Sequence, residues 1–245
     1  MSNIAKGKPA EFGDFIIRRR LKLLEDVEGF FDRSKSILDI GCGNGSSLLL
    51  IHDQYKHCHG VDITQSSLDE FGERIQKNGI KNCNYSLENV DDKFCEDQTF
   101  DRIISFEVLE HVGNDQTVAN GMFDKLIPGG LMAISVPNKW WIFETHGAHL
   151  PILPWNRIPF FSWLPKPIHS KYSKARIYRK NDIKKILNKS GFEILDQWYI
   201  TAPMDVVSWE SLKWFLRGTV FKPHSTQVPI LATSIMTICR KPVIN

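Results

Sequence analysis

With 245 residues, of which 42% are hydrophobic and 24% charged, the chain has the composition of one globular domain with elaborations, neither disordered nor fibrous. Its formal net charge of +3 is too small to indicate nucleic-acid binding by itself, and no apolar run approaches the roughly 20 residues of a membrane span. The five cysteines include no Cys-x-x-Cys pair and no signal peptide is recognisable, so we expect a reducing, cytoplasmic setting.

A helix is predicted over residues 11–31, where apolar side chains recur at helical spacing. Arg18, Arg19 and Arg20 lie on its polar side, and we favour a solvated face for them.

A short apolar run at 37–40 predicts a buried parallel strand, and glycines follow at alternate positions, Gly41, Gly43 and Gly45. Residues 46–52 then show a helical pattern. A strand that passes through a glycine turn into a helix is the nucleotide-binding corner of a doubly wound sheet. The spacing is Gly-x-Gly-x-Gly, not the Gly-x-Gly-x-x-Gly of dinucleotide sites. A tight turn without a ligand is the alternative.

The second predicted strand, 57–62, ends in an acid. A carboxylate at this place accepts hydrogen bonds from a ribose, although Asp62 could instead cap the next helix. Along the chain we expect a helix at 65–78, strands at 82–87 and 100–106, a helix at 113–125 and a strand at 131–136.

Residues 137–178 break the regular pattern with prolines and tryptophans, and no acid occurs between Glu144 and Asp182. A long irregular insertion that follows a strand at the ligand-binding edge is more often functional than not, so we interpret it as a substrate cap. A hydrophobic mini-core with a basic rim is the alternative. A helix at 180–190, a strand at 192–200, a helix at 208–217 and a strand at 229–239 complete the pattern.

Five segments in order resemble the motifs of class I S-adenosylmethionine-dependent methyltransferases (the type 11/12 group), and the ubiquinone-biosynthesis O-methyltransferases in particular. They are 38–45, 60–62, 86–89, 100–112 and 126–135. The resemblance implies an α/β, Rossmann-like sandwich: a mostly parallel seven-stranded sheet, antiparallel in its last strand, with helices on both faces. It also implies one domain in four parts: an N-terminal helical lid (1–35), a cofactor-binding core (36–136), the cap (137–178) and the rest of the sheet (179–245).

The resemblance assigns S-adenosylmethionine as the cofactor. Asp39 and the glycine loop would meet its methionine part, Asp62 its ribose, and Ile63, Glu88 and Asn89 its adenine. Glu88 stands where many relatives have aspartate. The full set of expected cofactor-binding residues is Asp39, Gly41, Cys42, Gly43, Gly45, Asp62, Ile63, Glu88, Asn89 and Glu107.

Glu107, Glu110 and His111 would share one face if their segment were helical, and two carboxylates with an imidazole can hold a divalent cation. The pattern resembles the E-x-x-E-H of ubiquinone-pathway O-methyltransferases and small-RNA 2′-O-methyltransferases, which implies Mg²⁺. Without a metal, His111 or a cap histidine, His146 or His149, is the natural general base. Both cap histidines could also be ordinary loop surface.

We therefore expect O-methylation of a small-molecule, lipid-linked or glycan hydroxyl. The cap, with its tryptophans and lysines, could contact a membrane peripherally. Nucleic acid is not an expected partner. The alternatives are an RNA 2′-O-methyltransferase and a non-catalytic cofactor-binding subunit, and a nicotinamide oxidoreductase is disfavoured by the glycine spacing.

Overall fold

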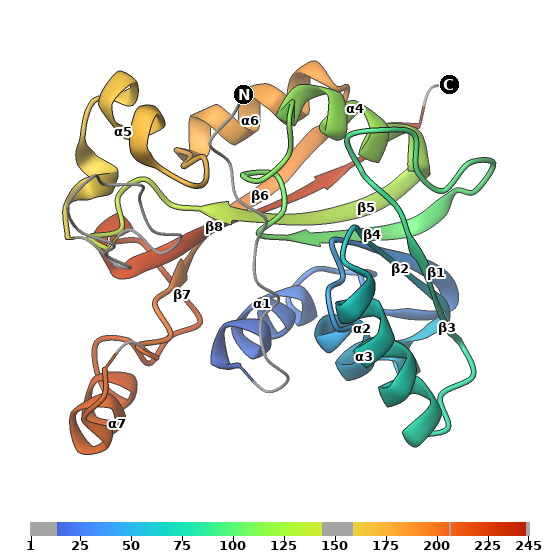
Figure 1. The fold of residues 1–245 in the computed structure, drawn as a ribbon, viewed down its shortest axis with the longest axis horizontal. Coiled ribbons are helices and arrows are strands. Elements are labelled where there is room, and N and C mark those ends of the chain that lie inside the picture. The colour runs from blue at the N-terminus through green and yellow to red at the C-terminus, as the bar shows by residue number, and fades with distance from the viewer. Residues whose placement is uncertain (1–13, 144–158, 206, 244–245) are drawn as a thin grey trace.

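The computed structural model describes residues 14–143, 159–205 and 207–243. Its centre is one sheet in the order β3-β2-β1-β4-β5-β8-β6-β7 (Figure 1). Neighbours from β3 to β5 run parallel, whereas β8 is antiparallel to both β5 and β6. The strands are β1 (Asp32–Ile40), β2 (Tyr55–Asp62), β3 (Cys83–Leu87), β4 (Phe100–Phe106), β5 (Leu126–Pro137), β6 (Glu193–Thr201), β7 (Ser225–Thr226) and β8 (Ala232–Arg240). The predicted Rossmann-like sheet is confirmed, with the two-residue β7 as an eighth strand.

Helices cover both faces of the sheet (Figure 1). On one face lie α1 (Phe15–Glu25), α2 (Ser46–Ile51) and α3 (Gln65–Lys77), and on the other α4 (Asp115–Lys125) and α6 (Lys180–Lys189). Two further helices, α5 (Lys166–Tyr172) and α7 (Glu210–Gly218), lie at one end of the long axis, and α7 protrudes from the body. Among the described residues, no helix has the length and apolar character needed to cross a bilayer.

Alternation along the strands divides the core into two layers. Leu38 and Ile40 of β1 pack with α4 and α6. Ile37, which precedes them in the strand, packs with α1, α2 and α3. Ile103 and Ile104 of β4 separate in the same way. Successive side chains of a strand point to opposite faces, so a continuous apolar run is needed where both faces are covered.

The segment 107–113 is a turn, not the helix that the metal motif presupposed. Glu107 has a left-handed φ of 59°, and the helix begins only at Asp115, where the Asn114 side chain accepts from the amides of Gln116 and Thr117. Distant groups take the carbonyls that a helix would use internally: the Arg176 amide donates to Glu110, and its guanidinium to Val112 and Gly113.

Other differences from the predicted elements also have tertiary causes. The described part of the first helix ends at Glu25, not at residue 31, and Phe30 beyond it is fully buried against the sheet. Strand β5 begins at Leu126, and its register with β4 shifts across the Pro128–Gly130 turn. The cap contains regular structure, a 3₁₀ turn at Phe161–Trp163 and α5.

Candidate functional site

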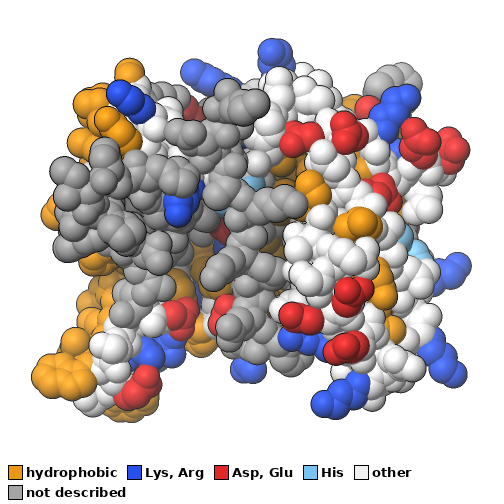
Figure 2. Space-filling view, in the orientation of Figure 1, with side chains coloured by type: hydrophobic (Ala, Val, Ile, Leu, Met, Phe, Trp, Pro, Cys, Tyr) orange, Lys and Arg blue, Asp and Glu red, His pale blue; other side chains and the backbone are white. Residues whose placement is uncertain are grey.

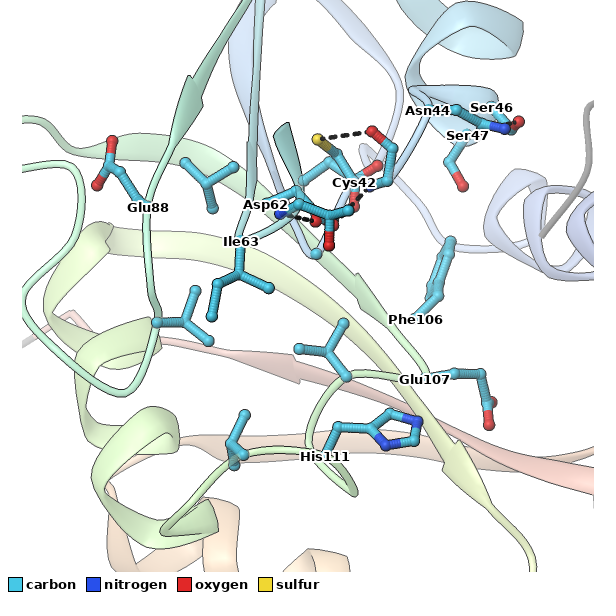
Figure 3. Close-up of a pocket in the computed structure, with 18 of the residues that line it drawn as sticks. Cys42, Asn44, Ser46, Ser47, Asp62, Ile63, Glu88, Phe106, Glu107 and His111 are labelled. Atoms are coloured by element: carbon cyan, nitrogen blue, oxygen red, sulfur yellow. Dashed lines mark hydrogen bonds between the residues drawn. The ribbon is translucent and has the colours of Figure 1, made fainter. Parts of the chain in front are cut away.

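A cavity of about 330 Å³ opens at the carboxyl ends of β1, β2 and β4. Figure 3 shows Glu107 and His111 on one side of it and Glu88 on the other, with Asp62 and Ile63 between them. This edge is where open α/β sheets bind ligands, because loops from neighbouring parallel strands converge there. Of the residues expected to bind cofactor, all but Gly45 line the cavity.

The glycine loop bends sharply beneath the cavity. Gly41 has φ 73°, and a Cβ there would come within 2.2 Å of the Val108 side chain. Gly45 caps α2 with φ 73°, and a Cβ there would collide with the Phe71 ring at 2.0 Å. Both glycines are therefore required by backbone conformation and by packing. Gly45 shapes the loop from below and does not line the cavity.

The Asp62 carboxylate stands at the centre of the cavity wall. One oxygen accepts from the Gly43 amide at 2.9 Å, and the other accepts from the Thr64 amide at 2.8 Å. The two bonds lock its orientation while each oxygen keeps a lone pair for a ligand. A carboxylate held in this way can accept both hydroxyls of a ribose.

Asp39, at the end of β1, is almost wholly buried beside Asp62. Burial, and then the charge of Asp62, raise the pKa of Asp39 well above its ordinary value of 3.8. A cationic group in the cavity would favour the ionised form of this carboxyl. The pair is therefore an electrostatic receptor for a positively charged ligand.

The part of the cavity that was expected to meet the adenine differs from the prediction in how its side chains are bonded. Ile63 is 45% exposed at the cavity, which suits packing against a flat ring. The Glu88 carboxylate is directed away from Asp62 (Figure 3) and accepts from the Cys95 amide at 2.6 Å and from the Ser86 hydroxyl. The Asn89 side chain bonds within its own loop, accepting from the Asp91 amide at 3.1 Å.

The loop after β4 carries the chemistry-bearing side chains. Glu107 accepts from Ser135 at 3.0 Å and from the Arg20 guanidinium at 2.7 Å. Glu110 is fully buried, and burial together with the charge of Glu107 raises its pKa well above the ordinary value of 4.5. His111 lines the cavity, with its Nε2 3.7 Å from a Glu110 oxygen.

Helix α1 closes one side of the cavity with Ile16, Ile17 and Arg20. The interpretation of a solvated arginine face was wrong for two of the three residues: Arg19 and Arg20 are buried and only Arg18 is exposed. Arg20 pairs with Glu107, and its guanidinium carbon lies 5.4 Å from the Phe106 ring centre.

The described end of the cap packs onto the same loop. The Arg176 side chain binds the carbonyls of Val112 and Gly113, and the buried Tyr178 hydroxyl donates to the Leu109 carbonyl at 3.2 Å. No local sequence pattern indicates either contact. The two cap histidines, His146 and His149, lie outside the described residues.

The Mg²⁺ prediction for Glu107, Glu110 and His111 does not fit this arrangement well. Arg20 already pairs with Glu107, and the raised pKa of Glu110 opposes the ionised form that a cation ligand requires. Within the described ranges, the group whose ligand atoms all lie within 4.8 Å is instead His59, Glu88 and Cys95. Burial raises the pKa of the Cys95 thiol to about 12, and Glu88 is committed to its loop, so this group is a hydrogen-bonded cluster.

Comparison with known proteins identifies the class. The family model described as "Methyltransferase domain" matches residues 31–191, well over half of the chain. The chain belongs to the S-adenosylmethionine-dependent methyltransferases, whose cofactor is S-adenosylmethionine. The nicotinamide alternative is thereby set aside.

Among its relatives are ubiquinone biosynthesis O-methyltransferases. That of Rickettsia typhi is 31% identical over 214 residues, covering 79% of this chain and 82% of the relative. That of Rickettsia akari is 27% identical over 238 residues, covering 84% and 90%. The crystal structure of an S-adenosylmethionine-dependent methyltransferase from Clostridium acetobutylicum shares the fold, with a TM-score of 0.63 at 13% identity over 96% of this chain and 93% of that one.

Proposed function

We propose that this methyltransferase acts on a hydroxyl group of a small, largely apolar acceptor, such as a lipid-linked phenol or glycan. The observation that carries the proposal is the position of His111, which lines the same cavity as the fixed Asp62 carboxylate. The relatives named as ubiquinone biosynthesis O-methyltransferases support an oxygen acceptor.

Asp62 would hold the ribose hydroxyls, Ile63 would pack on the adenine, and the Gly41–Gly43 backbone would pass along the methionine part. Asp39 would face the ammonium group. The bound cofactor supplies an activated methyl group on a sulfonium. What the chain adds is position and the exclusion of water, because an in-line displacement depends on alignment of donor and acceptor.

His111 would receive the proton of the acceptor hydroxyl. The acceptor oxygen forms a bond to the methyl carbon while the carbon–sulfur bond breaks and its electron pair stays on sulfur, leaving a neutral thioether. An imidazole is suited to take the released proton because its unperturbed pKa is close to neutrality. Arg20, bound to Glu107, would keep that carboxylate from competing for the proton.

The cap supports an apolar acceptor. Phe160 and Trp163 are exposed on it, and its described residues, 137–143 and 159–178, include five lysines and arginines and no acid. Such a surface suits a long apolar acceptor with a negative group, and a peripheral contact of the 137–178 segment with a membrane that holds the acceptor.

The test is methyl transfer by wild type and His111→Gln, using methyl-labelled S-adenosylmethionine and a panel of phenols with and without an apolar tail. Loss of a general base should lower kcat by about 10²–10⁴-fold. Cofactor affinity, measured by calorimetry, should stay within about threefold, since His111 is assigned to the acceptor. Equal turnover by both proteins, or methylation confined to amines, would refute the proposal.

A further inference from the structure

Helix α7 presents large aromatic side chains to solvent. Trp209 is 74% exposed, Trp214 79% and Phe215 57%, and Leu212 and Val220 extend the patch. The helix already has a buried side, because Leu216 packs on a small core around Trp141, Ala202 and Phe221. Trp209, Trp214 and Phe215 are thus exposed outside the contact that attaches α7 to the domain. Exposed apolar patches of this extent mark interaction sites.

The patch lies at one end of the molecule. Figure 1 places α7 and α5 at the same end of the long axis, and Figure 2 shows hydrophobic side chains gathered there. Of the 16 large hydrophobic side chains exposed among the described residues, ten fall within 160–168 and 209–230. Two segments far apart in sequence thus present apolar side chains at a common end, as docking onto a planar surface requires.

The charge at this end favours an anionic lipid surface. Residues 159–178 of the cap include four basic residues and no acid, and Lys222 is exposed just beyond α7. Tryptophan and lysine together are typical of side chains at the boundary between headgroups and acyl chains. The three aromatic rings of α7 offer on the order of 100–200 Å² each. That is roughly half of the about 800 Å² that each partner buries in a stable protein interface.

The residues on either side of α7 are connected to the cavity through α1. The buried Arg19 guanidinium donates to the carbonyls of Thr201 at 3.2 Å, Pro223 at 2.7 Å and Phe221. Thr201 precedes the segment that contains α7, and Phe221 and Pro223 follow it. Arg217 of α7 and Arg19 both lie over the Phe15 ring, 4.8 and 4.7 Å from its centre. The next residue, Arg20, pairs with Glu107 in the cavity.

We propose that α7 is a bilayer anchor: Trp209, Trp214 and Phe215 enter the interfacial layer of an anionic membrane and hold the domain there. This goes beyond the proposed function, because the anchor is neither the cap segment nor part of the cavity. Because α1 joins the anchor to the cavity wall, docking through α7 would place the site at the membrane surface, where an acceptor with a long apolar tail resides.

The experiment is co-sedimentation of the full chain with vesicles of phosphatidylcholine alone and of phosphatidylcholine mixed with phosphatidylglycerol. Wild type is compared with the double variant Trp209→Ala/Trp214→Ala, with Trp163→Ala in the cap and with Leu195→Ala, an exposed residue on β6 outside the patch. Calorimetric titration with S-adenosylmethionine accompanies each variant, so that a folding defect or failure of the cofactor site is distinguished from loss of docking.

We expect binding to the mixed vesicles, at least tenfold weaker in the double variant and unchanged in Leu195→Ala, with cofactor affinity equal in all. A blue shift of tryptophan fluorescence on adding vesicles should also be largely lost in the double variant. The proposal is overturned if wild type ignores both vesicle types, or if Trp163→Ala alone abolishes binding while the double variant binds normally. A dimer that depends on Trp209 and Trp214 without vesicle binding would likewise overturn it, in favour of a second copy.

Discussion

At the scale of single residues, the cavity is defined by carboxyl groups whose ionisation depends on what they face. Asp62 is held by two amides, whereas the neighbouring Asp39 is buried and its pKa is raised. A protein can keep such a carboxyl when a cationic ligand compensates for burial. Burial of Asp39 therefore carries a stability cost that a cationic ligand would offset.

This cost predicts a pH dependence for Asp39→Asn. Because the folded-state pKa of Asp39 lies above its unfolded value, its contribution is fully present below about pH 4 and is lost as the pH rises towards the folded pKa. Asparagine does not titrate. Between about pH 4 and pH 7 the variant should therefore become more stable relative to wild type, and each kcal/mol gained should raise its Tm by about 2–4 °C. The variant should also bind S-adenosylmethionine more weakly. Thermal unfolding at both pH values checks this, and parallel Tm profiles would contradict it.

A second prediction concerns Glu110, whose pKa burial and the charge of Glu107 raise well above the ordinary value of 4.5. Glutamine keeps its shape and neutrality, so Glu110→Gln should retain methyl transfer within about threefold, and EDTA should not lower the activity of wild type. A metal ligand would not tolerate this change. Two results together would reinstate the predicted metal site. The variant would lose activity, and wild type would lose activity in EDTA and regain it when Mg²⁺ is added.

At the scale of elements, every strand except the two-residue β7, together with α3, α4 and α6, could be predicted because their signals are local. Strand β4 was predicted with its observed ends, 100–106, since an apolar run bounded by polar residues is sufficient. The turn at 107–113 could not be predicted, because its hydrogen bonds come from Arg176 and Tyr178, more than 60 residues away. The burial of Arg19 likewise depends on carbonyls about 200 residues later.

The same limit applied to the candidate site. The glycine loop and Asp62 were located from sequence, because close backbone approach demands particular residues at particular positions. Arg20 and the shielding of Glu110 were missed, since only the folded chain brings α1 and the end of the cap to the loop after β4.

Helix α1 offers a matched pair of arginines for a stability test. Arg19→Met removes a buried donor to three carbonyls, whereas Arg18→Met alters an exposed side chain. We expect the first to lower the free energy of unfolding by about 3–5 kcal/mol, and the second to change it by less than about 0.5 kcal/mol. Urea unfolding measures both, and similar values for the two variants would show that Arg19 does not anchor the helix.

At the scale of the whole molecule, the fold separates three tasks. The layered core supports the sheet edge where the cavity opens, α1 borders that cavity, the described end of the cap packs on the loop after β4, and α7 projects from one end of the molecule. The general motifs lie in the core, and the exposed aromatic and basic side chains gather outside it. Cofactor chemistry and acceptor choice are thus carried by different parts of the chain, as is usual when function is added to a common fold.

The most direct test of the central claim is a calorimetric titration with S-adenosylmethionine of wild type, Asp62→Ala and the surface control Asp69→Ala. Wild type and the control should bind with a stoichiometry near one per chain. Asp62→Ala should bind about 10²-fold more weakly, because two charge-assisted hydrogen bonds to the ribose are lost. No binding by folded wild type, or equal binding by Asp62→Ala, would contradict the assignment of the cavity to the cofactor.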